Sequence, residues 1–540
     1  MARKLLDDEP PLPVWQEAEK HFFIAWPVVV NMICYRLPWM VTLMFVGRLG
    51  EVELATAAMA TTLANVTGSS ILVGLSSAQA TLSAQAFGSG DYARVGIVLQ
   101  QTLLVFGIAC FLASLLWAFG IDPFLRATGQ DPQIASLTRN YLCWLIPGLF
   151  GSSVTFALQR FLQAQGITKP PAVAALITAV IHVPVNVVFI PWLGMGLRGA
   201  ALATSINQML TPLVLLSIMI DPCSFRSLKE PMKVTSVGTE IVDDAAEKDK
   251  FINQGNSRNM EVESEGKALE IRPDSYLMCW QGWSAEALNW GAMVDFLRLG
   301  GAGLVMIMEW WASEIAILMS GSSDGSQGLS AMSLYQMTNS FCFMVAKGFE
   351  VSTSTRVGVA LGAAQPKSAQ RAATVGPGLA FLESSVLAVL LLLNRSTIPL
   401  LFTGTATEAA RATAARVTAT YPFLAFYIIA DATSSCLGGA ITGCGRQRYG
   451  AIIVLVAYGM VGLPTCALLA FRYKHGYLGI VFGMTLGTFL QCCGNFVITV
   501  CTDWDKESIA AVERIKGKNT SLAKESPELL SQEDEDTTNL

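Results

Sequence analysis

The stretch FLRLGGAGLVMIMEWWASEIAILMS, residues 296–320, is long and apolar enough to cross a lipid bilayer. It nevertheless contains two carboxylates, Glu309 and Glu314, beside the tryptophans Trp310 and Trp311. An ionised carboxylate is costly in hydrocarbon, so an acid inside a membrane span is a candidate functional residue by default. Two acids in one span predict a site that handles protons or cations. The alternative is a structural role in an ion pair or hydrogen bond.

The rest of the chain has the same apolar character. Of its 540 residues, 52% are hydrophobic and 14% are charged, whereas a soluble domain carries about 25% charged residues. Apolar segments of about 20 residues recur along the chain, which predicts an all-α polytopic membrane protein. The net charge of −5 argues against nucleic acid as a partner. Its 12 cysteines form no CxxC pair or His/Cys cluster, so we predict no metal site.

Twelve transmembrane helices are predicted from the apolar segments. The first six are Phe22–Gly47, Leu54–Ala80, Val95–Gly120, Tyr141–Ala164, Pro171–Leu193 and Gly199–Ile220, and the second six are Phe296–Ser320, Leu329–Ser352, Ala372–Leu393, Val417–Gly443, Gly450–Phe471 and Gly476–Val500.

The polar segments divide the chain into five parts. Residues 1–21 form an N-terminal segment, 22–220 a first lobe, 221–285 an acidic loop expected to be disordered, 286–502 a second lobe, and 503–540 an acidic tail that begins as a short amphipathic helix. An even span count places both termini and the loop on one side of the membrane. Basic residues near the termini favour the cytoplasmic side; they are Arg3, Lys4, Lys506, Arg514, Lys516 and Lys518.

The two halves are related by an internal duplication. Gly74-Leu75 followed by Phe87-Gly88 has a counterpart in Gly348-Phe349 followed by Leu361-Gly362. Such matches recur at an offset of about 275–280 residues, which indicates two repeats. With six spans each, the repeats enter from the same side. This predicts two six-helix lobes about an axis along the membrane normal, with a cavity between them and alternating access.

Acidic residues are confined to the second half of the spans. The first six predicted spans contain no Asp or Glu, whereas the second six contain Glu309, Glu314, Glu350, Glu383 and Asp431. Five helical positions separate Glu309 from Glu314, a rotation of about 140°, so the two point in different directions. We predict that Glu309, Glu314 and Asp431 handle protons or substrate.

Other polar residues in the spans have competing interpretations. Lys347 is three positions before Glu350, so an ion pair explains both without a functional role. Arg36, the lone base deep in the first span, could bind an anion, pair with an acid, or reach toward the interface. Further candidates for lining a substrate cavity, each with helix packing as the alternative, are Trp310, Tyr335, Gln336, Asn65 and Tyr458.

An ordered series of motifs resembles the multidrug and toxin extrusion (MATE) transporters, in the eukaryotic branch that contains the animal organic-cation exporters. The resemblance spans about Phe22 to Trp504 apart from the central loop. The motifs are VGRLG (46–50), NVTG (65–68), GLSSA (74–78), GWS (282–284), EWWASE (309–314), RVGVALGA (356–363), GCGRQ (443–447) and VGLP (461–464).

The resemblance implies proton-coupled antiport of organic substrates, with the family's second-lobe acids at Glu309, Glu314 and Asp431. The first-lobe aspartate of many prokaryotic relatives would fall near Thr42, which does not titrate. Gln336 stands where animal members tend to carry a glutamate, and Ala346-Lys347 stands where the family has a proline. These departures, with the added charge of Arg36, leave a zwitterionic or anionic substrate open.

We therefore expect a secondary transporter rather than an enzyme, which exports a small organic cation, needs no cofactor and works as a monomer. The proton is the expected driving ion, with sodium as the alternative. Rival functions are a lipid-linked saccharide flippase and a receptor or channel. The tail sequence ESPELL, residues 525–530, fits an acidic dileucine sorting pattern and suggests the plasma membrane or an endosomal or vacuolar membrane.

Overall fold

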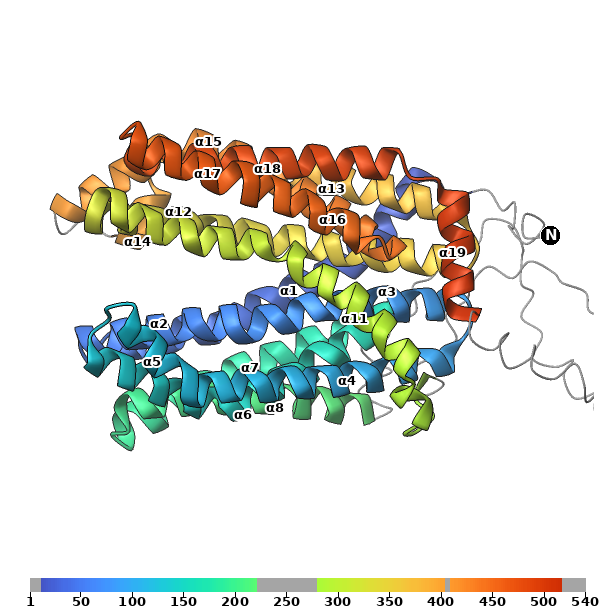
Figure 1. Cartoon of the computed structure of the whole chain (residues 1–540), viewed down its shortest axis with the longest axis horizontal. Coiled ribbons are helices and arrows are strands. Elements are labelled where there is room, and N and C mark those ends of the chain that lie inside the picture. Colours follow the sequence, from blue (N-terminus) through green and yellow to red (C-terminus); the bar gives the residue numbers. More distant parts are fainter. Residues whose placement is uncertain (1–10, 221–278, 404–407, 517–540) are drawn as a thin grey trace, which may run out of the picture.

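The computed structural model describes residues 11–220, 279–403 and 408–516. The helices lie in two layers, blue to green for the first lobe and yellow-green to red for the second (Figure 1). The first lobe contains α1 (Val14–Val46), α2 (Glu51–Ala64), α3 (Ser70–Gly88), α4 (Tyr92–Leu115), α5 (Ile121–Ala127), α6 (Pro132–Ala164), α7 (Lys169–Val187) and α8 (Gly196–Ile220). The second contains α11 (Trp290–Met306), α12 (Met308–Gly362), α13 (Pro366–Leu393), α14 (Ile398–Thr403), α15 (Glu408–Cys444), α16 (Gln447–Val454), α17 (Leu463–Ala467) and α18 (Gly476–Val500), and then α19 (Trp504–Lys516).

Several membrane helices consist of consecutive α-helical pieces. Short π-helical stretches join these pieces, so the chain continues in one direction while the side chains change register. The joining stretches are Asn65–Ser69, Leu116–Gly120 and Leu455–Gly462, whereas two further π-helical stretches, Val188–Trp192 and Leu468–Arg472, end their helices.

The protein is an all-α polytopic membrane protein, but the span count differs from the prediction. In the described residues, 11 helices are long and apolar enough to cross a membrane. The difference is the predicted eighth span, Leu329–Ser352, which lies in α12 beyond a break at Gly325, where φ is 64°. This part of α12 packs inside the second lobe through residues such as Met332. It carries several polar side chains that are buried in protein, among them Thr338, Asn339 and Ser352, and these lower its hydropathy below that of the other spans.

The structure differs from the prediction at the start of the first lobe. The first helix begins at Val14 rather than Phe22, so residues predicted as part of an N-terminal segment are helical, and Glu17 among them is buried. The predicted disordered loop lies largely outside the described residues, as does the tail from residue 517. The last residues of the loop are ordered against α4, where the Gln100 amide donates to the carbonyl of Gly282 at 2.7 Å.

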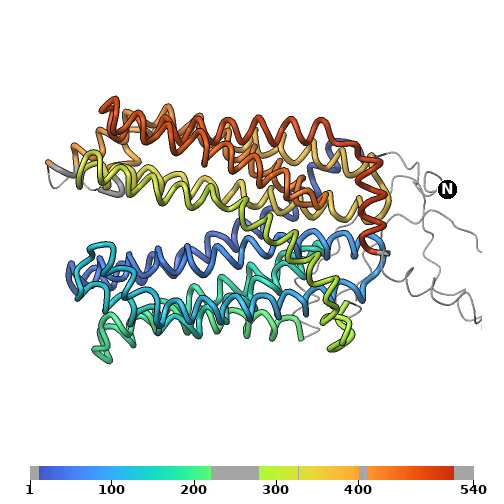
Figure 2. Tube along the Cα trace, in the orientation of Figure 1, coloured from blue at the N-terminus to red at the C-terminus, as the bar shows by residue number. Residues whose placement is uncertain are grey.

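The first helix of each lobe begins against the other lobe. α1 packs on α12 and α13 before it reaches α7 and α8, while α11 packs on α3 before it reaches α16. Both crossings can be followed in the Cα trace (Figure 2). The exchange is symmetric, as the duplication requires: Gly74 of α3 lies against Leu304 of α11, and its counterpart Gly348 of α12 lies against Ala25 of α1.

A second glycine pair brings α3 and α12 together at the end of the bundle where α19 lies. A Cβ at Gly88 would collide with the backbone of Val359, and a Cβ at Gly362 would collide with the backbone of Gln85. The duplicated glycines therefore allow two helices from different lobes to cross at backbone contact.

Hydrogen bonds between the lobes gather at the same end. The Gln85 amide donates to the carbonyl of Gly443 at 2.9 Å, and Thr81 Oγ1 donates to the carbonyl of Thr442 at 2.6 Å. From α19, Arg514 Nη1 donates to Gln85 Oε1 at 2.6 Å. Toward the opposite end the two layers of ribbon diverge (Figure 1). The lobes are thus held together on the side where α1 begins and α19 lies.

Candidate functional site

Glu309 and Asp431 meet in the interior of the second lobe. Glu309 stands in the first turn of α12, and the Gln491 side chain of α18 donates to its Oε2 at 3.0 Å. Asp431 of α15 is 3% exposed and lies beside Glu309 and the amide of Asn339. Its Oδ1 has no hydrogen-bond partner in the described part of the chain. Two neighbouring carboxyl groups repel each other when both are ionised, so the arrangement favours a proton or a cation between them.

Aromatic side chains form a wall beside the acid pair. Tyr335, Tyr427 and Tyr458 are all buried. The rings of Tyr335 and Tyr427 meet edge to face with centroids 6.4 Å apart, and the Tyr458 hydroxyl lies 2.7 Å from Thr488 Oγ1. Aromatic faces attract a desolvated cation, so acids and rings together suit an organic cation.

The other acid of the same segment points elsewhere. Glu314 is half-buried, contacts Trp310, and faces the positive charge of Arg36 from α1 in the first lobe. Its neighbour Trp311 also reaches the first lobe, where its Nε1 donates to Ser70 Oγ at 3.2 Å. Glu309 therefore faces the interior of its own lobe and Glu314 the lobe interface, which is the divergence expected from helical rotation.

The first lobe has a cavity of its own, of about 100 Å³. Arg36 and Asn65 both line it, and Arg36 is the one charged residue among the lining residues in the described chain. Deeper in this lobe, Thr42 Oγ1 lies 2.8 Å from His182 Nε2 and 3.2 Å from Asn186 Oδ1. The hydrogen-bonded group of Thr42, His182 and Asn186 thus occupies the position where the resemblance would place the first-lobe aspartate of many prokaryotic relatives.

The structure brings the predicted residues Glu309 and Asp431 together, and it leaves other predicted residues elsewhere. Of the predicted residues, Gln336 is half-buried next to Tyr335, and no described contact joins it to the acid pair. The residues that were missed are polar or aromatic groups in contact with Glu309, Asp431 or Tyr458; they are Tyr427, Gln491, Asn339 and Thr488. Tyr427 could have been found, because it precedes Asp431 by one helical turn. The others carry no local signal.

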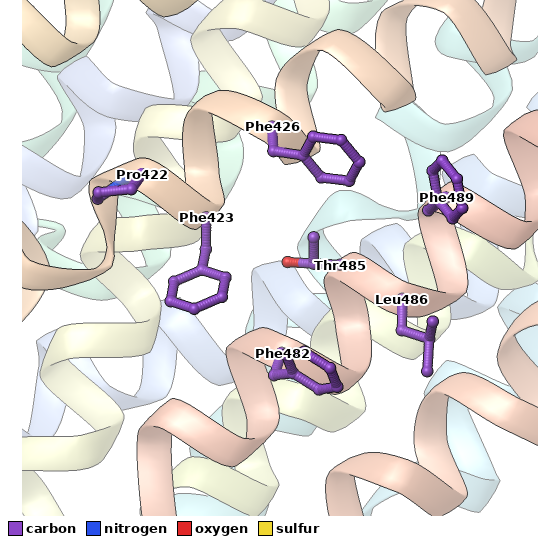
Figure 3. Close-up of a pocket in the computed structure, with 7 residues that line it drawn as sticks. All are labelled: Pro422, Phe423, Phe426, Phe482, Thr485, Leu486 and Phe489. Carbon is purple, nitrogen blue, oxygen red and sulfur yellow. The ribbon is translucent and has the colours of Figure 1, made fainter.

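A second hollow lies on the outside of the second lobe, between α15 and α18. Figure 3 shows phenylalanine rings around it. Its volume is about 360 Å³ and no ionisable side chain lines it. The rings are between 40% and 49% exposed, as expected of side chains that face lipid. This groove is therefore part of the membrane-facing surface, not a site for ion chemistry. It is lined by Pro422, Phe423, Phe426, Phe482, Thr485, Leu486 and Phe489.

Comparison with known families matches both lobes. The MatE family model covers residues 27–188 and 302–468, one block in each lobe. The chain belongs to the MATE family. It is therefore an integral membrane protein of a family of multidrug and toxin extrusion transporters, which export small organic compounds.

Relatives of this MATE protein come from plants and animals. Protein DETOXIFICATION 16 of Arabidopsis thaliana is 30% identical over 94% of this chain and 93% of its own length. Multidrug and toxin extrusion protein 1 of Danio rerio is 30% identical over 97% of this chain and 79% of its own length. The crystal structure of the eukaryotic MATE transporter AtDTX14 has a TM-score of 0.78 and 28% identity, and covers 93% of this chain and 99% of that chain. These similar proteins belong to a family of transporters.

Proposed function

We propose that this MATE protein is a proton-coupled antiporter that exports organic cations by alternating access. The observation that carries the proposal is the pairing of Glu309 with the buried Asp431 beside a wall of tyrosines. A proton and an organic cation compete for such a site, because either one relieves the repulsion between the two carboxylates. Competition for one site is the simplest way to couple two opposite fluxes.

The transport cycle follows from that competition. With the acid pair open to the more acidic compartment, protonation removes negative charge and releases the cation. When the lobes reorient, the pair loses its proton to the less acidic cytoplasm, and the restored charge binds another cation. Glu314 at the lobe interface, near Arg36, is placed to sense the approach of the two lobes.

Reconstituted protein tests the proposal. Proteoliposomes with an imposed pH gradient should accumulate tetraphenylphosphonium, a rigid organic cation. Asp431→Asn and Glu309→Gln should each remove most of the pH-driven uptake. Glu383→Gln is the matched control, since Glu383 lies in a membrane span of the same lobe but not in the acid pair; it should retain uptake. Unchanged uptake in both Asp431→Asn and Glu309→Gln would exclude the acid pair as the coupling site.

A second candidate substrate class is an organic anion or zwitterion. The observation in its favour is the first-lobe cavity, whose described lining has the cationic Arg36 and no acid. Uptake of tetraphenylborate, an anion of the same shape as tetraphenylphosphonium, tests it: transport that is lost in Arg36→Gln would favour the anion. A lipid-linked saccharide flippase needs more cationic groups along its path than Arg36 and Lys347 provide.

The proposal also covers the driving ion, the oligomeric state and the membrane. We take the proton as the driving ion, without a cofactor, and the monomer as the working unit. The termini are proposed to be cytoplasmic, in the plasma membrane or an endosomal or vacuolar membrane. Replacing the pH gradient by a sodium gradient at equal pH tests the ion, since sodium-driven uptake would contradict the assignment.

A further inference from the structure

A short segment leads into α11 at the end of the bundle where α19 lies (Figure 1). Its residues, 279–290, include three tryptophans and one charged residue, Glu286. Trp283, Leu288 and Trp290 are 77%, 69% and 76% exposed. Large apolar side chains gathered in one exposed segment indicate an interaction surface.

The first lobe holds this segment in place through α4. The Gln100 side chain makes two hydrogen bonds to its backbone: Nε2 donates to the carbonyl of Gly282 at 2.7 Å, and Oε1 accepts from the amide of Ser284 at 2.9 Å. Cys279 is fully buried, and a Cβ at Gly96 of α4 would collide with its carbonyl. The Gly-Trp-Ser motif therefore serves as the attachment of the segment to α4, with its tryptophan left exposed between the two attached residues.

The backbone of the segment is hydrogen-bonded although it contains little regular structure. Ser284 Oγ accepts from the amide of Glu286 at 3.2 Å, and the amides of Ala287 and Asn289 donate to the carbonyls of Ser284 and Glu286 at 3.2 and 3.1 Å. Asn289 Oδ1 then accepts from the amide of Ala292 at the start of α11, at 3.2 Å. Paired backbone groups lower the cost of leaving water. The segment can therefore enter a water-poor environment that an open loop could not.

The depth of the segment in the membrane follows from α4. Leu104, Ile108 and Phe111 follow Gln100 at helical spacing, so all four share one face of α4. The three apolar side chains are exposed, as expected where a helix faces lipid, whereas Gln100 is buried. Leu104 lies one helical turn, about 6 Å, from Gln100. The polar boundary of a bilayer is about 5–7 Å thick on each side of the hydrocarbon, so the segment lies at the level of that boundary.

We propose that residues 279–290 are an interfacial membrane anchor, in which Trp283, Leu288 and Trp290 insert between the lipid headgroups and the acyl chains of the leaflet beside α19. Tryptophan suits this position because its ring buries apolar surface while its N–H can bond to headgroups. Lipid is the occupant because the exposed side chains continue the lipid-facing stripe of α4. This role is independent of which substrate the protein exports.

The anchor has a consequence for the candidate site. α11 starts at Trp290 and ends at Met306, directly before the first turn of α12, which carries Glu309. α11 also packs on α3 of the first lobe along the way. The anchor therefore fixes the depth at which the helix leading to the acid pair enters the membrane.

Photochemical crosslinking of full-length protein in phosphatidylcholine–phosphatidylglycerol vesicles tests the proposal. The photoreactive residue p-benzoyl-phenylalanine replaces Trp283 or Trp290, and mass spectrometry identifies what it captures. We expect phospholipid adducts at both positions, with a yield similar to that at Phe111 of α4, the lipid-facing reference. The same residue in place of Lys506 on α19, whose side chain is 83% exposed and bonded to Asp503, should capture no phospholipid.

A second variant tests how the segment is held. Gln100→Leu removes both hydrogen bonds to the segment, so the phospholipid yield at position 283 should fall several-fold. Gln101→Leu is the matched control on α4, because the side-chain nitrogen of Gln101 has no hydrogen-bond partner in the described part of the chain; the yield should stay the same. The adduct at position 111 must persist in both variants, which shows that each is folded and inserted.

The outcomes separate lipid from other occupants. Capture of phospholipid at position 111 but not at 283 or 290 overturns the anchor. Capture of residues 221–278 of the same chain, or of a second copy, in place of phospholipid also overturns it and assigns the surface to that occupant. An undiminished yield at position 283 in Gln100→Leu overturns the role of Gln100 in holding the segment.

Discussion

Removal of Arg356 should destabilise the protein by an amount that the structure allows us to estimate. Arg356 of α12 binds Glu17 of α1 through two guanidinium nitrogens. Its Nε donates to Oε1 at 2.8 Å and its Nη2 donates to Oε2 at 2.6 Å. Glu17 is 1% exposed, so Arg356→Met leaves a buried carboxylate without its main partner. Breaking such a buried pair from one side costs roughly 3–5 kcal/mol. His21 Nε2 lies 3.5 Å from the same carboxylate and offsets part of the loss, which places the expectation near 3 kcal/mol.

The double variant provides the internal check. Replacement of both partners by apolar residues removes the stranded charge, so Glu17→Met/Arg356→Met should lie within about 1 kcal/mol of the unaltered protein. The assay is equilibrium unfolding in mixed micelles with increasing denaturing detergent, followed by loss of helical circular dichroism. The exposed pair Arg126–Asp122 is the control, since Arg126→Met should cost less than about 1 kcal/mol. The reasoning is refuted if Arg356→Met is as stable as the control, or if the losses of the single variants simply add in the double variant.

Three further predictions concern other parts of the fold. Alanine at Gly88 or Gly362 places a Cβ against the backbone of the other lobe and should shift the protein toward the conformation open beside α19. Thiol labelling of single cysteines at that end measures the shift. Alanine at Gly107, where nothing lies within 4 Å of the added Cβ, should have no effect. Thr42→Val leaves buried partners unsatisfied and should lower the free energy of unfolding by about 1–3 kcal/mol; an unchanged unfolding midpoint would contradict it. Burial raises the pKa of Glu507 on α19, so the folded protein binds this proton more tightly than the unfolded chain does. The docking of α19 should therefore be most stable below the ordinary carboxyl pKa and become less stable as pH rises through the raised pKa. Hydrogen exchange of α19 should show this pH dependence and lose it in Glu507→Gln.

Much of the architecture follows from the sequence because membrane insertion is a local property. An apolar run of about 20 residues is sufficient to define a span, and the EWWASE segment was conspicuous since acids are rare in such runs. The eighth span shows the limit of this reasoning. It was predicted from its apolar residues, but buried polar residues such as Thr338 and Asn339 lower its hydropathy below that of the other spans. Helix breaks such as Gly325 and the π-helical stretches leave little trace in composition.

The site was only partly predictable because its contacts join distant parts of the chain. Glu309 was identified from its own span, but its hydrogen-bond donor Gln491 lies on the last membrane helix. Glu17 appeared to belong to a polar terminal segment, although its partner Arg356 lies in the other lobe. Local patterns indicate which residues are costly to bury. The fold decides which groups compensate them.

The duplication preserved backbone geometry and allowed the chemistry of the lobes to diverge. Gly88 and Gly362 make equivalent contacts across the lobe interface, as do Gly74 and Gly348, so either lobe can pivot about the same crossings. At the interior positions the symmetry is lost, since Thr42 with His182 and Asn186 occupies the first lobe while Glu309 and Asp431 occupy the second. Equivalent crossings allow either lobe to move in the same way, but within the described residues the paired carboxylates lie in the second lobe. If the proposed coupling is correct, the direction of transport is set by that chemical asymmetry and not by the hinge.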